Sequence, residues 1–342
     1  MQNYELPTLE NLVRATIPEN QVRIFHTADI QINAAGVWKH REYEYRYMLR
    51  LMTIRAIESG ANIVVIPGDI FERARTTENE KQIFNDWIHD LLDTGFIIIA
   101  TAGNHDLQQK NFLYDDGTGD NRTAIDSIEL CHTAIKHPNF YYLQKSGFYP
   151  MEIHGRQYMI ANWSHKTLYS DFIEDYNPWD NAEKSAKVKA LSPSVPVIEL
   201  YHNPLYDCQD WDGSVVKGNN DTRVHSNEFK SGHIALLGDI HIPAIQRNDI
   251  GTVWSYPSSP VMRNFGEGDY YENSVLISDR LNRHGYNLVD IIFNDGEVKP
   301  TYDIKFYGLP QYNALHTIDL KKLDKEIVDS FKLVNASKFV NN

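Results

Sequence analysis

Cysteine is scarce in this chain of 342 residues, which contains only Cys131 and Cys208. Neither lies in a Cys-x-x-Cys or Cys/His zinc spacing, so a disulfide framework and a cysteine-based zinc site are excluded. Long apolar runs are also lacking: no stretch approaches the ~18 residues that a membrane span needs, and residues 1–20 have neither region of a signal peptide. We therefore expect a soluble, cytoplasmic protein with no membrane segment.

Basic residues are in deficit as well. The chain has 33 Lys and Arg against 46 Asp and Glu, which gives a formal net charge of -13. Because neutralising phosphates requires clustered Lys and Arg, this balance argues against a protein that coats nucleic acid unaided. A local basic patch remains compatible with it. With 42% hydrophobic residues, the chain can bury the core of one large domain or of two.

What the sequence does contain is an alternation of apolar runs with stretches of helical period. Such an alternation predicts an α/β fold, in which central β-sheets are flanked by helices and the first strands are parallel. The later half is richer in hairpin-like patterns. The expected strands are residues 22–29, 61–69, 96–106, 195–203 and 233–239, and the expected helices are residues 43–59 and 80–95.

Five of these apolar runs end on residues that can bind metal. Ligands of α/β sheets bind beyond the carboxyl ends of the strands, so side chains far apart in sequence are expected to meet there. One Gly-Asp alone is an ordinary turn, whereas five strand ends of this kind indicate a site. The residues at these ends are Asp29 and Gln31; Asp69; Asn104, His105 and Asp106; His202; and Asp239 and His241.

The order of these motifs resembles that of the calcineurin-like metallophosphoesterases. The matching segments are "ADIQ", "PGDIFE", "AGNHD", "YHN" and "LGDIHIP", of which "GNHD" after a buried strand is the most specific. Within that superfamily the chain is similar to the SbcD nucleases, especially to their short phage-type relatives. "GDIFERAR" and "YPSSPVMRNFGEGD" (256–269) carry this closer similarity, and the resemblance covers about residues 22–300.

The resemblance implies a two-metal site, in which one carboxylate bridges the cations. His105 would then act on the scissile phosphate as a proton donor or charge stabiliser. The mixture of oxygen and imidazole donors favours Mn²⁺ and tolerates Mg²⁺. By the family pattern, Asp69 bridges the two cations. The other ligands of one cation are Asp29, Gln31 and His241, and those of the second cation are Asn104, His202 and Asp239. Gln31 and Asp239 stand where many relatives have histidine.

The resemblance also implies a function. We expect a two-metal-dependent DNA nuclease, exonuclease or endonuclease, that acts in DNA end processing, recombination or repair. It would work as a homodimer with an SbcC-type ATPase subunit, in the host cytoplasm if the gene belongs to a phage. Two alternatives stay open: a phosphomonoesterase or protein phosphatase, because the same motifs serve either ester, and an inactive scaffold subunit, because Gln31 and Asp239 depart from the pattern.

Three further expectations concern the remainder of the chain. Lys39, Arg41 and Arg46 form a basic segment that could contact DNA phosphates, although an ordinary solvated helix face has the same composition. The chain is divided into an N-terminal extension (1–20), a metallophosphoesterase nuclease domain (21–300) and a short C-terminal capping or partner-binding segment (301–342). Residues 318–334 have helical apolar spacing.

Overall fold

The computed structural model describes residues 5–33, 41–107, 127–163, 176–206, 208, 223–263, 267, 269–272, 275–278, 280–312 and 316–318. Its α-helices are α1 (Glu42–Ser59), α2 (Glu78–Asp93), α3 (Ser127–Ile135) and α4 (Ala182–Lys189). The strands are β1 (Gln21–His26), β2 (Ile63–Pro67), β3 (Ile97–Thr101), β4 (Phe140–Tyr142), β5 (Gly147–Ile153), β6 (Arg156–Asn162), β7 (Val197–His202), β8 (Ile234–Gly238), β9 (Ala244–Arg247), β10 (Val253–Tyr256), β11 (Asp269–Glu272), β12 (Val275–Ser278), β13 (Gly285–Ile292), β14 (Thr301–Gly308) and β15 (His316–Ile318).

Within the described residues, the strands form two six-stranded sheets and one small sheet. The first large sheet has the order β14-β13-β1-β2-β3-β4, and the second has the order β5-β6-β7-β8-β10-β9. In the first sheet β1 to β4 are parallel, whereas β13 runs antiparallel to β1. In the second, β6, β7, β8 and β10 are parallel. The small sheet consists of β12, β11 and β15.

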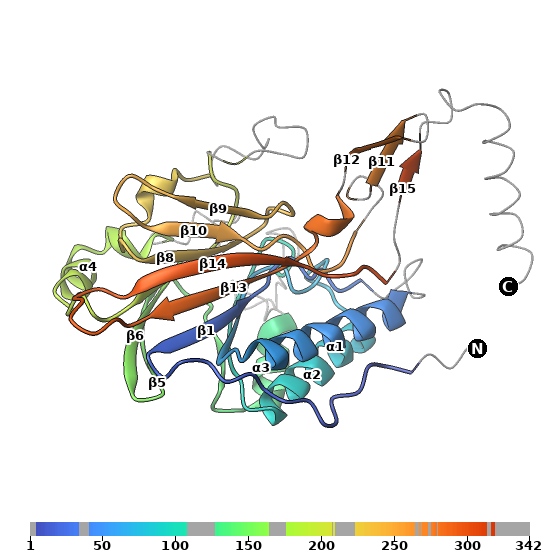
Figure 1. Cartoon of the computed structure of the whole chain (residues 1–342), viewed down its shortest axis with the longest axis horizontal. Helices are drawn as coiled ribbons and strands as arrows, with labels where there is room; N and C mark the ends of the chain where they lie inside the picture. Colours follow the sequence, from blue (N-terminus) through green and yellow to red (C-terminus); the bar gives the residue numbers. More distant parts are fainter. Residues whose placement is uncertain are drawn as a thin grey trace, which may run out of the picture.

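Three hydrophobic clusters hold together the sheets and helices whose arrangement is drawn in Figure 1. Val22 and Ile24 on β1 pack with Ile198 on β7 and Ile234 on β8, so this cluster lies between the two large sheets. Phe25, which points to the other face of β1, belongs to a cluster that also contains residues of α1 and α2. A third cluster joins the outer face of the second sheet to α4. The order is therefore helices, sheet, sheet and helix.

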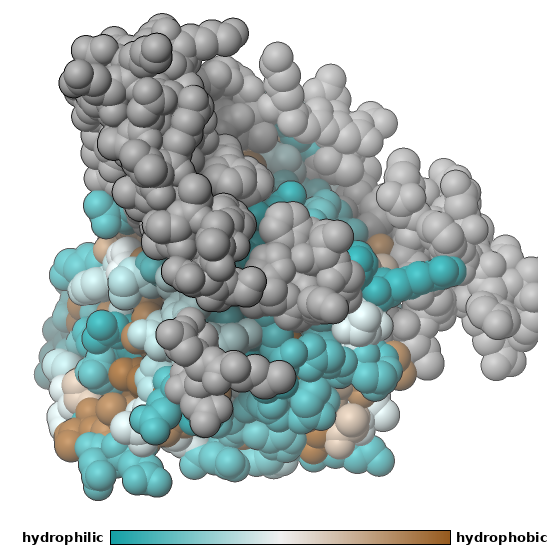
Figure 2. Space-filling model, turned by 90° about the vertical axis from the view of Figure 1, so that its right-hand side faces the viewer, coloured by the Kyte–Doolittle hydropathy of each residue, from teal (hydrophilic) through white to brown (hydrophobic). Residues whose placement is uncertain are grey.

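Local sequence signals set the ends of the first two helices. Gly60 follows α1 with φ 75°, a left-handed conformation that glycine adopts without strain, and its N–H bonds back to the last turn. Thr77 and Glu80 form a capping box at the start of α2. On the described part of the surface in Figure 2, hydrophilic residues predominate and hydrophobic ones form small areas between them.

The predicted fold class is confirmed. The expected strands and helices are present, with the strands shorter at their carboxyl ends because the residues that follow turn into loops. The first large sheet continues past residue 300, since β14 pairs with β13 over eight residues. The division into three segments stays a prediction, and the helical pattern at 318–334 lies almost wholly outside the described residues.

Candidate metal centre

Three side chains from three strand ends meet at the centre of the candidate site. Asp29 follows β1, Asp69 follows β2 and His202 ends β7, and one ligand atom of each lies within 4.8 Å of the others. The His202 Nε2 atom is 3.2 Å from Asp69 Oδ1 and 4.0 Å from Asp29 Oδ1. All three residues are buried. The two sheets thus bring together groups that are up to 173 positions apart in sequence.

Three more predicted ligands surround this centre. Asn104 places its Oδ1 atom 3.2 Å from His202 Nε2, and the Asp239 Oδ1 atom is 3.9 Å from the same nitrogen. On the other side, His241 Nε2 is 3.9 Å from Asp29 Oδ1. Asn104 is exposed and Asp239 half-buried, so the cluster is open to solvent on their side.

The backbone of the ligand-bearing loops is strained. Asp29, Gln31, Asp69 and Asp239 have φ angles of 54°, 49°, 51° and 92°, in the left-handed region that non-glycine residues rarely adopt. Each such residue costs about 1 to 3 kcal/mol and persists where surrounding contacts fix it. Here the Gln31 N–H donates to the Asp69 carbonyl, and the Asp239 N–H donates to the Asp29 carboxylate. Strain of this kind clusters at functional sites.

Glycines allow the loops to approach the buried ring of His202. A Cβ atom on Gly68 or Gly238 would overlap this ring, and one on Gly103 would overlap both the ring and the Asp69 carboxylate. The glycines that precede Asp69 and Asn104 in the sequence motifs are therefore explained by the lack of space for a Cβ atom.

Hydrogen bonds orient both imidazoles toward the cluster. His202 Nδ1 donates to the Pro67 carbonyl at 2.7 Å, and His241 Nδ1 bonds to Glu267 Oε1 at 2.9 Å. The Nε2 atoms consequently face the carboxylates, which is the arrangement that metal-binding histidines adopt. Asp106, buried behind the loops, accepts the N–H groups of Gly103 and Phe71 at 2.9 Å each and so ties two strand ends together.

The electrostatics show a site that requires positive charge. Burial raises the pKa of Asp29 to about 7, the imidazoles of His202 and His241 oppose this rise, and the carboxylates of Asp69 and Asp239 add to it. Burial also raises the pKa of Asp239. For His202 burial opposes protonation, yet the carboxylates of Asp69, Asp29 and Asp239 hold its pKa well above its ordinary value. Carboxylate, amide and imidazole donors are ligands of divalent cations, which would supply the charge that these groups attract. The residues therefore fit a metal centre.

Gln31 is held by hydrogen bonds to Asp69 and Arg263. Its Nε2 atom donates to Asp69 Oδ2 at 3.1 Å, and its Oε1 atom accepts from Arg263 Nη1 at 2.7 Å. Rotating the amide would place oxygen against carboxylate and NH₂ against guanidinium, so both partners fix this orientation. Coordination of a cation through the amide oxygen stays a prediction.

His105 lies at the rim of the cluster. Its Nδ1 atom bonds to the Glu72 carbonyl at 2.7 Å, and its Nε2 atom is 3.8 Å from Asp69 Oδ2. With 29% of its side chain exposed, the ring can be reached from solvent while remaining anchored. That His105 acts as a proton donor or charge stabiliser in catalysis stays a prediction.

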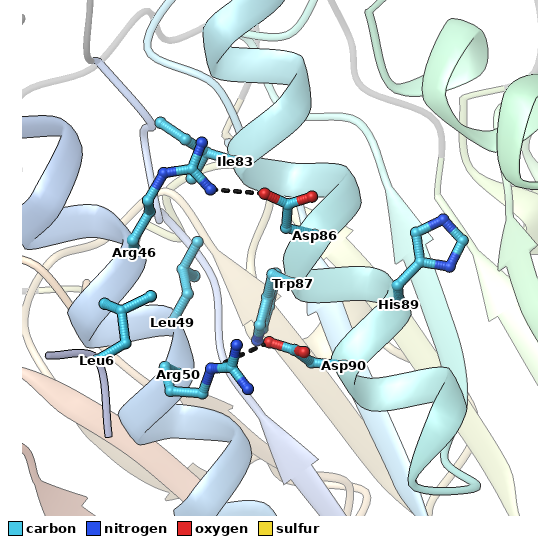
Figure 3. Close-up of a pocket in the computed structure, with 9 residues that line it drawn as sticks. All are labelled: Leu6, Arg46, Leu49, Arg50, Ile83, Asp86, Trp87, His89 and Asp90. Carbon is cyan, nitrogen blue, oxygen red and sulfur yellow. Dashed lines mark hydrogen bonds and ion pairs between the residues drawn. The ribbon is translucent and has the colours of Figure 1, made fainter. Parts of the chain in front are cut away.

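The predicted DNA-contacting residues lie in different settings. Lys39 is outside the described residues. Arg41 is buried, with Nε 2.6 Å from Glu44 Oε2. Arg46 is paired with Glu42 and Asp86, and Figure 3 shows it reaching from α1 to α2. DNA contact by these residues stays a prediction.

Sequence reasoning assigned no role to two residues that complete the site. Glu267 orients His241 with one carboxylate oxygen and accepts the N–H of Arg263 at 2.7 Å with the other. Both residues lie in the segment "MRNFGE", whose similarity to SbcD nucleases was the available signal.

Buried acids and imidazoles at the carboxyl ends of strands in two facing sheets define a metal-dependent phosphoesterase fold. The family model of the calcineurin-like phosphoesterases matches residues 22–222. The chain belongs to this family. In the part of the chain that the structure describes, no helix has the length and apolar character needed to cross a membrane.

Individual relatives are more distant. The chain is 25% identical over 289 residues to the uncharacterized protein R555 of Acanthamoeba polyphaga mimivirus, in an alignment that covers 81% of this chain and 19% of that protein. It is 22% identical over 258 residues to the DNA double-strand break repair protein Mre11 of Methanopyrus kandleri, covering 72% and 50%. The SbcD component of the SbcCD nuclease of Escherichia coli is 27% identical over 85 residues, covering 25% and 21%.

Among solved structures, TT1561 of Thermus thermophilus matches with a TM-score of 0.37 and 13% identity, covering 69% of this chain and 89% of that one. The chain spans between about a fifth and half of the length of the curated relatives named above.

Proposed function

We propose that this protein is a two-metal-dependent DNA nuclease that hydrolyses phosphodiester bonds. The observation that carries the proposal is the convergence of Asp29, Asp69 and His202, with Asn104, Asp239 and His241 around them, in a phosphoesterase fold. DNA is inferred as the substrate because two relatives are named as a DNA repair protein and a nuclease subunit.

In this proposal the residues have separate tasks. Asp69 would hold the bridging position, which is supported by its Oδ1 atom lying 3.2 Å from His202 Nε2 and by its place in one cluster with Asp29. Asp29 and His241 would bind one cation, and Asn104 and His202 would bind the other. Asp239 adds an anionic donor beside His202. Bound divalent cations, Mn²⁺ or Mg²⁺, would neutralise the phosphate and activate a water molecule.

His105 is proposed to stabilise or protonate the phosphate oxygens. Its Nδ1 atom is held by the Glu72 carbonyl, and its Nε2 atom is 3.8 Å from Asp69 Oδ2 in a side chain that is 29% exposed. An imidazole anchored through one nitrogen presents the other in a fixed direction, as acid–base or electrostatic assistance requires.

The biological setting is part of the same proposal. We infer that the chain works as a homodimer with an SbcC-type ATPase subunit in DNA end processing. The net charge of -13 supports this, because an acidic chain needs another surface to bind duplex DNA tightly at physiological salt.

Three substrates distinguish the possible activities. Purified protein with Mn²⁺ is incubated with linear DNA, with bis-p-nitrophenyl phosphate and with p-nitrophenyl phosphate, and Asp69→Asn serves as the inactive control. Cleavage of DNA and of the diester supports the proposal. Hydrolysis of p-nitrophenyl phosphate alone would establish a phosphomonoesterase instead, and no hydrolysis of any substrate would indicate a scaffold subunit.

A further inference from the structure

Arg263 lies next to the candidate metal centre, in the loop that follows β10. Its Nη1 atom donates to Gln31 Oε1 at 2.7 Å, and Gln31 in turn donates to Asp69 at 3.1 Å. Only one side chain therefore separates the guanidinium from the carboxylate at the centre of the cluster. The motifs of the metal centre do not include this arginine.

The backbone of Arg263 is fixed on both sides. Its N–H donates to Glu267 Oε2 at 2.7 Å, and its carbonyl accepts from Arg41 Nη1 at 3.4 Å. The same Glu267 orients His241 through its other oxygen. The position of the arginine is thus coupled to a proposed ligand, so that the guanidinium has a defined place relative to the centre.

Among the described residues, the hydrogen bond from Arg263 Nη1 to Gln31 leaves further N–H groups of the guanidinium without a hydrogen bond. Its Nε atom is 3.7 Å from Glu72 Oε2, which is an ion pair but too long for a hydrogen bond. The facing Glu72 Oε2 atom is buried and has no hydrogen-bond partner among the described residues. The Arg263 side chain is 31% exposed, so a ligand from solvent can reach its remaining N–H groups.

We propose that Arg263 is a phosphate-binding residue of this site and that Gln31 positions it. A guanidinium presents a planar set of donors that matches two oxygens of a phosphate. Its positive charge lies one side chain away from Asp69, in a cluster whose carboxylates would otherwise repel an anionic substrate. Gln31, with its oxygen on Arg263 and its nitrogen on Asp69, connects the phosphate-binding group to the proposed bridging carboxylate.

This inference rests on the proposed phosphoester chemistry, but inorganic phosphate tests it without any cleavage of DNA. Calorimetry measures phosphate binding to the Mn²⁺-loaded protein, and elemental analysis counts the bound Mn²⁺. Arg263→Ala should weaken phosphate binding by about tenfold to a hundredfold, the effect of losing a charge-assisted contact, and leave the Mn²⁺ count unchanged. Arg263→Lys, which keeps the charge and loses the planar fork, should lie between Arg263→Ala and wild type.

Two further variants make the test specific. Arg55→Ala removes an equal charge from an exposed pair with Glu58 on α1 and should change phosphate affinity by less than about twofold. Gln31→Met keeps the side-chain length without its hydrogen bonds, and it should weaken phosphate binding while the Mn²⁺ count stays at the wild-type value. Circular dichroism and thermal melting verify that each variant is folded.

Several results would overturn the proposal. Unchanged phosphate affinity in both Arg263 variants would show that the arginine does not bind phosphate. If folded Arg263→Ala lost Mn²⁺, the arginine would be needed for metal binding and not for phosphate binding. If Gln31→Met lost Mn²⁺, Gln31 would be a metal ligand. A wild-type protein that binds phosphate through Arg263 and cleaves the diester, yet leaves DNA intact, would refute the DNA substrate and retain this inference.

Discussion

Replacing His26 with glutamine should make the stability of the protein less sensitive to acid. His26 lies at the end of β1, fully buried, and its Nε2 atom donates to the Leu237 carbonyl of the second sheet at 3.1 Å. Its Nδ1 atom is 3.5 Å from both Ser255 and Asn287. Because a carbonyl only accepts, the proton sits on Nε2 and the neutral ring joins the two sheets beneath the metal centre.

The magnitude follows from the pKa of this ring. Burial lowers the pKa of His26 from 6.5 to about 3. Below pH 6.5 the unfolded chain binds a proton that the folded chain does not, so the free energy of unfolding decreases as the pH falls toward 3. At about 1.36 kcal/mol for each pKa unit, the loss between pH ~7 and pH ~5 is about 2 kcal/mol, and it approaches about 5 kcal/mol at the acid limit.

Urea denaturation at several pH values measures this effect. The difference in unfolding free energy between wild type and His26→Gln should shrink by about 2 kcal/mol on acidification from pH ~7 to pH ~5, because only wild type can lose the His26 contribution. Other titrating groups are common to both proteins and cancel in the difference. A difference that stays constant over this range would show that His26 is not held neutral between the sheets.

The remaining predictions concern the site and a second buried acid. His105→Gln should lower turnover by ~10²-fold, the scale of a lost acid–base or charge-stabilising group, and should leave the Mn²⁺ count unchanged. If steady-state kinetics showed unchanged turnover, His105 would have only a structural role. Gly103→Ala should abolish Mn²⁺ binding, because the new Cβ overlaps Asp69 and His202, whereas Gly155→Ala, with no heavy atom within 4 Å, should retain it; equal Mn²⁺ binding in both would contradict the steric argument. Burial raises the pKa of Glu199 from 4.5 to about 7, so the folded chain binds the extra proton and stability should fall as the pH rises through this window, by about 3 kcal/mol in total. Glu199→Gln cannot ionise, and a denaturation series that shows the same decline in this variant would assign the decline to other groups.

The core sheets and their strand ends were predictable from the sequence for a physical reason. Strands buried on both faces, such as "IVVIP" in β2, read as continuous apolar runs, and parallel strands place their carboxyl ends on one edge. Asp29 and Asp69 could therefore be expected to meet. His202 could be added because β7 has the same character, although it lies in the other sheet.

Side-chain pairing was not predictable, because it depends on which residue faces which across the fold. Gln31 has the spacing of a ligand, but that spacing does not reveal that its amide oxygen accepts from the guanidinium of Arg263, 232 positions further along the chain. Arg41 stands in a segment whose composition is typical of a solvated basic surface. In the structure, however, Arg41 is enclosed by Glu44 and by carbonyl groups of the loop after β10. The alignment of β14 with β13 likewise depends on a long-range pairing that the local pattern does not contain.

The central claim is that the strand ends form one centre that binds two cations with Asp69 between them. The most direct measurement is a calorimetric titration of metal-free protein with Mn²⁺. It is made for wild type, for Asp69→Asn and for a control, Asp303→Asn, on strand β14, where Asp303 is exposed. The account predicts two cations per chain for wild type and for the control, and none for folded Asp69→Asn at the same concentrations. Two Mn²⁺ ions bound to Asp69→Asn with wild-type affinity would contradict it.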